Sequence, residues 1–168
     1  MSLRELAAAA VPPNGLWGDD LPGVICYHIA CGQLRKSTNG DILGTFHWAI
    51  ECDDAAVMAW TRVQMAEWPA DTTYWAAEAG ALSCLTHAHE NGAEWDPWTT
   101  AAAARAGALE CLAYARQHGA EWGDEVTYGA ARAGSLPCLT YAHEHGAEWH
   151  LETTATAALA GSLECLAY

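Results

Sequence analysis

The sequence predicts an all-α protein, built as a solenoid of paired short antiparallel helices. The first observation is a repeat: LSCLTHAHENGAEW, LECLAYARQHGAEW and LPCLTYAHEHGAEW follow one another at a constant interval. The second is the helical spacing of the apolar residues in each repeat, and the third is a glycine wherever a helix should end. A short period of this kind is typical of solenoids, in which each repeat packs only on its neighbours.

Aligned at this period, the chain divides into a non-repeating N-terminal segment and a repeat region. Residues 1–38 do not follow the period, and we expect them to form helices that cap the stack. Residues 39–168 contain the repeats, with boundaries at about 39–71, 72–98, 99–125, 126–152 and a partial repeat at 153–168. The first of these repeats is the most divergent.

Each repeat should begin with a short helix, which we place at about 73–79 in the second repeat. Gly80 follows it, and glycine readily adopts the left-handed conformation that ends a helix. Ala76, Ala77 and Ala79, with their equivalents in other repeats, should let the first helices of neighbouring repeats approach closely. No single repeat buries enough apolar surface to be stable, so the stack should supply the stability.

The second helix of each repeat is expected to begin near Leu82. Leu82, Leu85 and Ala88 recur at helical spacing and predict its buried face, with Cys84 beside them. In two repeats a serine, a residue type that caps helix N-termini well, precedes this helix: Ser135 and Ser162.

The cysteines allow either a packing role or a chemical role. Four of the seven recur at the period of the repeat, in one slot: Cys84, Cys111, Cys138 and Cys165. Packed helices lie about 8–10 Å apart, whereas a disulfide needs Cα atoms within about 7 Å. We therefore expect these cysteines to form a column in the core of a protein from a reducing compartment. The alternative is a metal or redox site that also uses the histidines.

The histidines favour that alternative less than their number suggests. Residues two apart on a helix, such as His87 and His89, point in different directions and do not chelate an ion by themselves. His118 and His145 share one slot before a glycine, where an imidazolium would favour a helix C-terminus. We assign no residue as a metal ligand and expect no cofactor.

The formal net charge is −14, with 21 acidic residues against seven basic ones. Such a surface repels phosphate backbones and anionic lipid, which disfavours binding to nucleic acid or to membranes and favours a basic partner. The alternative is that the acidity only keeps an alanine-rich chain soluble. No apolar run is long enough to span a membrane, and we expect a cytoplasmic protein.

Glu-Trp pairs also recur at the period, and we interpret them as structural. A carboxylate column at the rise of a solenoid implies no catalytic cleft, so we expect a solvated acidic stripe: Glu67, Glu94, Glu121 and Glu148. The neighbouring tryptophans should cover the end of each repeat with aromatic surface: Trp68, Trp95, Trp122 and Trp149.

Residues 76–95, AAEAGALSCLTHAHENGAEW, resemble the helix-loop-helix part of an ankyrin repeat. GTFHWAI at residues 44–50 resembles the start of such a repeat, with His47 in the place of its histidine. The repeats are shorter than the ankyrin length of about 33 residues, and the missing part corresponds to the β-hairpin finger, which should be reduced or absent. The motif C-L-x-Y-A-H-E-N-G-x-x-W is similar to that of ankyrin-type proteins of large DNA viruses of amoebae. This resemblance would place the protein in host cytoplasm.

The resemblance covers about residues 39–168 and implies a non-catalytic scaffold that binds proteins. In ankyrin-like proteins the first helices and the connections line a concave binding face, and both vary between these repeats. Tyrosine, tryptophan and arginine are the usual binding hot spots. The resulting candidates for partner binding are Tyr74, Trp75, Glu78, Trp98, Arg105, Tyr128 and Arg132.

The two ends of the sequence suggest further alternatives. Residues 20–34, DLPGVICYHIACGQL, faintly resemble the start of an F-box, which would make the protein a substrate adaptor for a ubiquitin ligase. We prefer the interpretation that residues 20–34 form a capping helix. The last repeat stops within its second helix, so we expect that end to fray or to associate with another molecule. A self-assembling structural protein is therefore another alternative to the scaffold.

Overall fold

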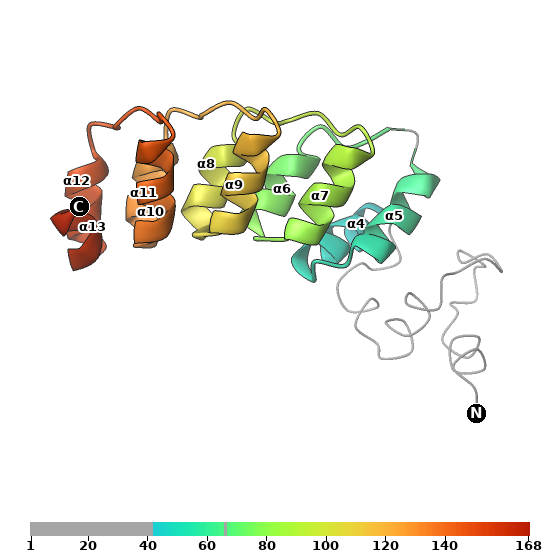
Figure 1. Cartoon of the computed structure of the whole chain (residues 1–168). Helices are drawn as coiled ribbons and strands as arrows, with labels where there is room; N and C mark the ends of the chain where they lie inside the picture. The colour runs from blue at the N-terminus through green and yellow to red at the C-terminus, as the bar shows by residue number, and fades with distance from the viewer. Residues whose placement is uncertain (1–41, 66) are drawn as a thin grey trace. The chain divides into compact units, whose positions relative to one another are not determined.

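The computed structural model describes residues 42–65 and 67–168, and within them it shows ten α-helices and no strand (Figure 1). The predicted all-α class is confirmed. The expected capping helices at 1–38, with the F-box-like segment 20–34, lie outside the described residues. The chain divides into two compact units, with the boundary between Trp68 and Pro69.

The first unit contributes one described helix pair, α4 (Ile42–Glu51) and α5 (Ala55–Gln64). Their shared core includes Phe46 and Met58, both fully buried. Asp53 lies between the helices with a φ of 51°, in the position that Gly80 holds one repeat later. Asp54 then caps α5, since its Oδ1 accepts hydrogen bonds from the backbone N–H groups of residues 56 and 57.

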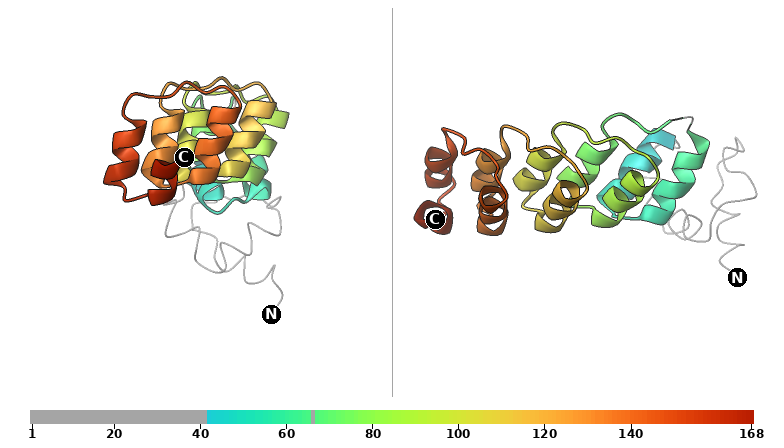
Figure 2. Two further views of the ribbon diagram at one scale, coloured as in Figure 1. Left: turned by 60° about the vertical axis from the view of Figure 1, so that its left-hand side comes forward. Right: turned by 45° about the horizontal axis from the view of Figure 1, so that its top comes forward.

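The second unit contains four helix pairs, whose starting residues follow the period of the sequence repeat. The first helices of the pairs are α6 (Thr72–Glu78), α8 (Thr99–Ala106), α10 (Val126–Ala133) and α12 (Thr153–Leu159). The second helices are α7 (Leu82–Glu90), α9 (Leu109–Gln117), α11 (Leu136–Glu144) and α13 (Leu163–Ala167). Each first helix contacts the next first helix, and each second helix contacts the next second helix, so the unit has two rows. The longer connections between pairs run along one edge of the unit (Figures 1 and 2).

Small side chains bring the first helices close together. The residues Ala101 to Ala104 of α8 are all buried. In α10, a Cβ built on Gly129 would lie 3.3 Å from both the Ala101 carbonyl oxygen and the Arg105 backbone nitrogen. Ala76 and Ala77 are buried, as the predicted close approach requires, whereas Ala79 is exposed, so the prediction is wrong for that residue.

The second helices place leucine and cysteine against the first row. Leu85, Leu112 and Leu139 are each 0% exposed, which matches the predicted buried face, whereas Leu82 is only half-buried. The four cysteines of the repeated slot are buried, as expected for a core column: Cys84, Cys111, Cys138 and Cys165. Burial raises the pKa of the Cys138 thiol, so the environment favours the neutral form.

The predicted helix ends agree with the structure. Gly80, Gly107 and Gly134 have φ values of 68°, 70° and 66°, the left-handed conformation expected of a glycine that ends a helix. The Ser135 hydroxyl accepts a hydrogen bond of 3.4 Å from the Cys138 backbone N–H at the start of α11. Ser162 holds the same position before α13 but makes no such bond.

Buried threonines fix the connections to the first helices. The Thr73 hydroxyl donates to the Glu94 carbonyl oxygen at 3.2 Å and accepts from the Asp96 N–H at 2.9 Å. Thr100 makes the same pair of bonds to Glu121 and Gly123, at 2.9 and 3.0 Å. Each connection is therefore held at two backbone groups, which positions the residues that lie between them. None of the described helices is both long and apolar enough to span a membrane.

Candidate functional site

The seven predicted residues occupy three places in the second unit. Tyr74, Trp75 and Glu78 lie on α6 and contact Arg105 on α8, directly or through one another. Tyr128 and Arg132 lie one helix further along the same row, on α10. Trp98 lies apart from both groups, in the connection that leads to α8.

Arg105 joins α6 to α8 through two side chains. Its Nη2 donates a hydrogen bond of 2.7 Å to the Tyr74 hydroxyl and lies 3.0 Å from Glu78 Oε1. The guanidinium carbon is also 5.8 Å from the centre of the Tyr74 ring. The Glu78 carboxylate and, to a lesser degree, burial raise the pKa of the Tyr74 hydroxyl, against the opposing effect of Arg105. These contacts join the two helices, while the second Glu78 carboxylate oxygen, Oε2, is buried and has no hydrogen-bond partner among the described residues.

Trp75 presents more surface to solvent than its neighbours in this cluster. Its side chain is 41% exposed, although the indole N–H donates a 2.7 Å bond to Asp71 Oδ2. The ring meets that of Tyr74 edge to face, with centroids 5.1 Å apart. The indole is therefore held in one orientation while much of its face stays accessible, a combination that suits a binding anchor.

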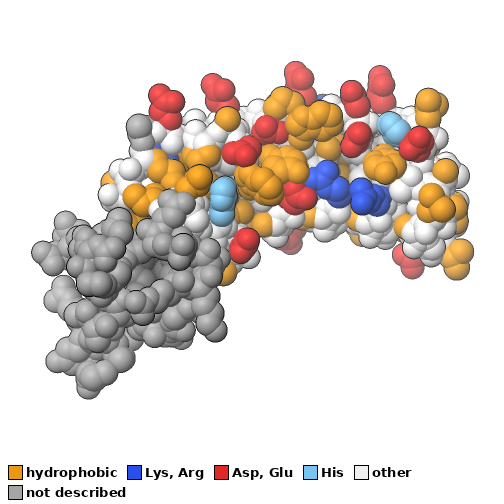
Figure 3. All heavy atoms as spheres, turned by 180° about the vertical axis from the view of Figure 1, so that it is seen from behind, with side chains coloured by type: hydrophobic (Ala, Val, Ile, Leu, Met, Phe, Trp, Pro, Cys, Tyr) orange, Lys and Arg blue, Asp and Glu red, His pale blue; other side chains and the backbone are white. Residues whose placement is uncertain are grey.

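Tyr128 and Arg132 continue this face on α10. The half-buried Tyr128 ring lies 5.5 Å from that of His150, and Arg132 is exposed with no ion pair among the described residues. Figure 3 shows the face: basic side chains lie together near its middle beside hydrophobic ones, and acidic side chains line the edge that carries the connections. Within the second unit, the first-helix face therefore differs in charge from the edge above it.

Variation between repeats does not always mark surface. The position of Trp75 is occupied by Ala102 in α8 and by Gly129 in α10, and both of those residues are buried. The small residues there allow close helix packing, so this variation follows from packing rather than from binding. Among these three residues only Trp75, the one that the sequence analysis selected, is exposed.

The repeated tryptophans join neighbouring repeats instead of only covering their ends. The Trp95 indole N–H donates to the His118 carbonyl oxygen at 3.0 Å, and Trp122 donates to the His145 carbonyl oxygen at 3.0 Å. Both acceptors are the residues that end a second helix, as expected for His118 and His145 from the sequence. Each indole thus satisfies one of the free carbonyl groups at a helix C-terminus.

An alternating set of side chains stacks on these tryptophans, and sequence reasoning missed it. The rings of His89 and Trp95 stack with centroids 4.6 Å apart, and one repeat later the Arg116 guanidinium lies 5.1 Å from the Trp122 ring centre. His89 Nδ1 is also 3.1 Å from the Tyr114 hydroxyl. Burial, followed by the charge of His118, lowers the pKa of His89. The sequence repeat could have revealed this set, because arginine and histidine alternate at one position of the repeat.

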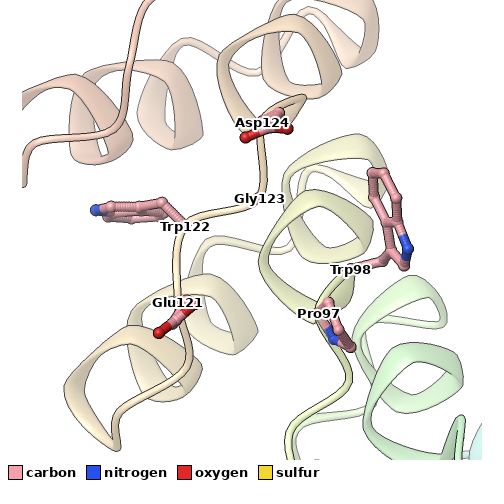
Figure 4. Close-up of a pocket in the computed structure, with 6 residues that line it drawn as sticks. All are labelled: Pro97, Trp98, Glu121, Trp122, Gly123 and Asp124. Atoms are coloured by element: carbon pink, nitrogen blue, oxygen red, sulfur yellow. The ribbon is translucent and has the colours of Figure 1, made fainter.

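A small pocket contains the remaining candidate, Trp98. It has a volume of about 200 Å³ and lies between two successive connections, lined by Pro97, Trp98, Glu121, Trp122, Gly123 and Asp124 (Figure 4). Sequence reasoning selected Trp98 and noted that residues 123–125 vary, but it treated Glu121 and Trp122 as purely structural because they repeat. The pocket is therefore lined both by residues that vary between repeats and by residues that recur.

The described residues contain no group of three or more His, Cys, Asp or Glu side chains placed to hold a metal ion. A comparison with models of known protein families finds no match, and a comparison with curated proteins finds none either.

Proposed function

We propose that the protein is a non-catalytic protein–protein interaction scaffold, an ankyrin-like helical-repeat solenoid that binds a partner through the face of its first helices. The observation that carries the proposal is Trp75, a large aromatic side chain that is 41% exposed on a helix otherwise packed through alanine and threonine. Arg132 and Tyr128 extend the same row, and these three residue types are common binding hot spots.

Two features support the ankyrin-like part of the proposal. The helix pairs recur at a constant period and form two rows, in which each pair contacts the next. The connections between pairs contain no strand within residues 69–168, which agrees with reduced or absent hairpin fingers. A cytoplasmic location belongs to the same proposal, supported by cysteines that pack as core residues.

Affinity capture with a matched pair of variants tests the scaffold. The Trp75→Ala/Arg132→Ala variant changes the first-helix face and leaves the hydrogen bond between Arg105 and Tyr74 in place. The control, Glu110→Ala/Glu144→Ala, changes exposed residues on the second helices. We expect a defined partner, identified by mass spectrometry and confirmed with purified components, to bind the wild type and the control and to lose at least tenfold in affinity for the face variant. Equal binding by both variants would contradict the proposed face.

Self-association is a second candidate, favoured by an apolar surface on α12 and α13. Leu159 and Leu163 are 89% and 78% exposed, and Leu166 is 39% exposed. Exposed apolar surface of this kind is typical of interaction sites. Sedimentation velocity over a range of concentrations tests it: a monomer at all concentrations would exclude this candidate, and a dimer dispersed by Leu159→Glu/Leu163→Glu would favour it.

A further inference from the structure

The pocket between the connections is built where the repeats differ. Gly123 occupies a slot that holds Asp96 one repeat earlier and His150 one repeat later, and Trp98 occupies a slot that holds glutamate in the next two repeats. A Cβ on Gly123 would lie 3.4 Å from both the Ala101 Cβ and the Pro97 carbonyl oxygen. The Gly123 N–H donates to the Thr100 hydroxyl, which holds this backbone in place along the wall of the pocket.

The walls of the pocket combine aromatic surface with carboxylates. Trp98 is 51% exposed, and its backbone N–H donates a 2.8 Å bond to Asp96 Oδ1, which fixes the turn that carries it. Glu121 and Asp124 are exposed and form no ion pair within the described part of the chain. Figure 4 shows Pro97 and Trp98 on one side of the Gly123 backbone, with Trp122 across it.

This composition suits a cation carried on an apolar stem. Lysine and arginine side chains lay their methylene groups on apolar surface and direct the charge elsewhere, and both are attracted to the face of an indole ring. The chain itself provides an example next to the pocket, since the Arg116 guanidinium lies 5.1 Å from the Trp122 ring centre. An anion is disfavoured by the two carboxylates, and a net charge of −14 attracts basic partners over a longer range.

We propose that this pocket binds the lysine or arginine side chain of a basic segment in a partner protein. The stem of that side chain packs on Pro97 and Trp98, and its charge lies toward Glu121 and Asp124. The inference rests on the proposed scaffold function, and it adds to the first-helix face a second contact of stated chemistry at the connections.

Nuclear magnetic resonance of the indole groups tests the pocket directly. The full chain is labelled with ¹⁵N and titrated with Nα-acetyl-lysine methylamide, Nα-acetyl-arginine methylamide or the neutral Nα-acetyl-norleucine methylamide. We expect the Trp98 indole signal, assigned with Trp98→Phe, to shift and saturate with a dissociation constant of about 1–10 mM, the range for one weak side-chain contact. The comparison of lysine with arginine distinguishes the two cations, and binding of either one supports the proposal.

Two charge-matched variants decide whether the binding is local. Glu121→Gln/Asp124→Asn should weaken binding at least fivefold, whereas Glu110→Gln/Glu144→Gln removes the same charge elsewhere and should change it less than twofold. Trp98→Ala, followed through the Gly123 amide signal, should abolish binding. This variant replaces the double variant in the test if the double variant does not fold. Equal shifts with the norleucine compound, equal losses in both charge variants, or no shift at Trp98 would each overturn the proposal.

The same titration separates this inference from the proposed function. If the Trp98 signal responds as expected but Trp75→Ala/Arg132→Ala loses no partner, the first-helix face is wrong and the pocket stands. If a partner depends on that face while the lysine and arginine compounds leave Trp98 unchanged, the scaffold stands and the pocket proposal fails.

Discussion

The inner pair α8/α9 and the last pair α12/α13 contain nearly the same repeated residues, but these residues differ in burial and in hydrogen bonding. Leu112 of α9 is 0% exposed, whereas Leu166, in the same slot of α13, is 39% exposed. Thr100 bonds to two backbone groups of its connection, whereas its equivalent Thr154 is exposed. The difference shows that a repeated residue acquires its role from the following repeat or connection, because that is where its partners lie.

The same comparison applies to the indole groups. Trp122 donates to the His145 carbonyl oxygen and is half-buried, whereas Trp149 is 42% exposed. The inner pair α8/α9 contacts a helix pair on each side, and we expect both sets of contacts to contribute to its stability. Paired substitutions at equivalent slots should measure this difference.

The largest contrast is expected between the two leucines. Leu112→Ala should lower the free energy of unfolding by about 2–5 kcal/mol, because it leaves a cavity in a closed core. Leu166→Ala should lower it by less than about 1 kcal/mol, since the side chain already meets solvent. Chemical denaturation followed by circular dichroism measures both, and equal losses would contradict the idea that position in the stack sets the contribution.

A smaller contrast is expected between the two threonines. Thr100→Val keeps the shape of the side chain but leaves the Glu121 carbonyl and the Gly123 N–H without this partner, at a cost of about 1–3 kcal/mol. Thr154→Val should leave the unfolding midpoint nearly unchanged. Hydrogen exchange at the Gly123 amide gives a local measurement, and unchanged protection in Thr100→Val would argue against the role of this hydroxyl.

A still smaller difference in stability is expected between the two serines that precede α11 and α13. Ser135→Ala removes the bond to the Cys138 N–H and should cost about 0.5–1 kcal/mol, toward the low end for caps because that bond is long. Ser162→Ala removes no such bond and should have no measurable effect on thermal unfolding. A comparable loss in both variants would mean that serine acts here through backbone preference and not through the bond.

The smallest effect expected is a dependence on pH at the His89 junction. Burial lowers the pKa of His89 in the folded state, so the unfolded chain binds more protons. Stability should therefore fall as the pH decreases through about 6.5, the ordinary value for histidine, and level off below the lower folded pKa. His89→Gln should reduce this dependence, measured as the change in urea midpoint between pH 7.5 and pH 5.

Arg116 provides the matched control, because it stacks on Trp122 one repeat later and does not titrate in this range. Arg116→Gln should shift the midpoint by the same amount at both pH values. If His89→Gln behaves in the same way as Arg116→Gln, the imidazole charge has no role at the junction.

Local sequence patterns predicted the helices well because their causes are local. Gly80 ends α6 through a backbone preference that needs no tertiary contact, and Leu85 faces the core because helical spacing places it there. The same patterns were less informative at Ala102 and Gly129, which share a variable position with Trp75 but are buried. They failed for Trp122, whose repetition concealed its place in a pocket wall.

The sequence by itself determined the period, the positions of the helices and their ends, and the cysteine and leucine slots that form the core. Only the tertiary structure decided which copies of a repeated residue are buried, that Arg105 bonds to Tyr74, and that Gly123 and Trp98 leave a pocket between two connections. The physical reason is one of distance along the chain. Helix formation depends on neighbours within one or two turns. Burial, ion pairs and pockets depend on residues about one repeat away, which come together only when the helix pairs pack against one another.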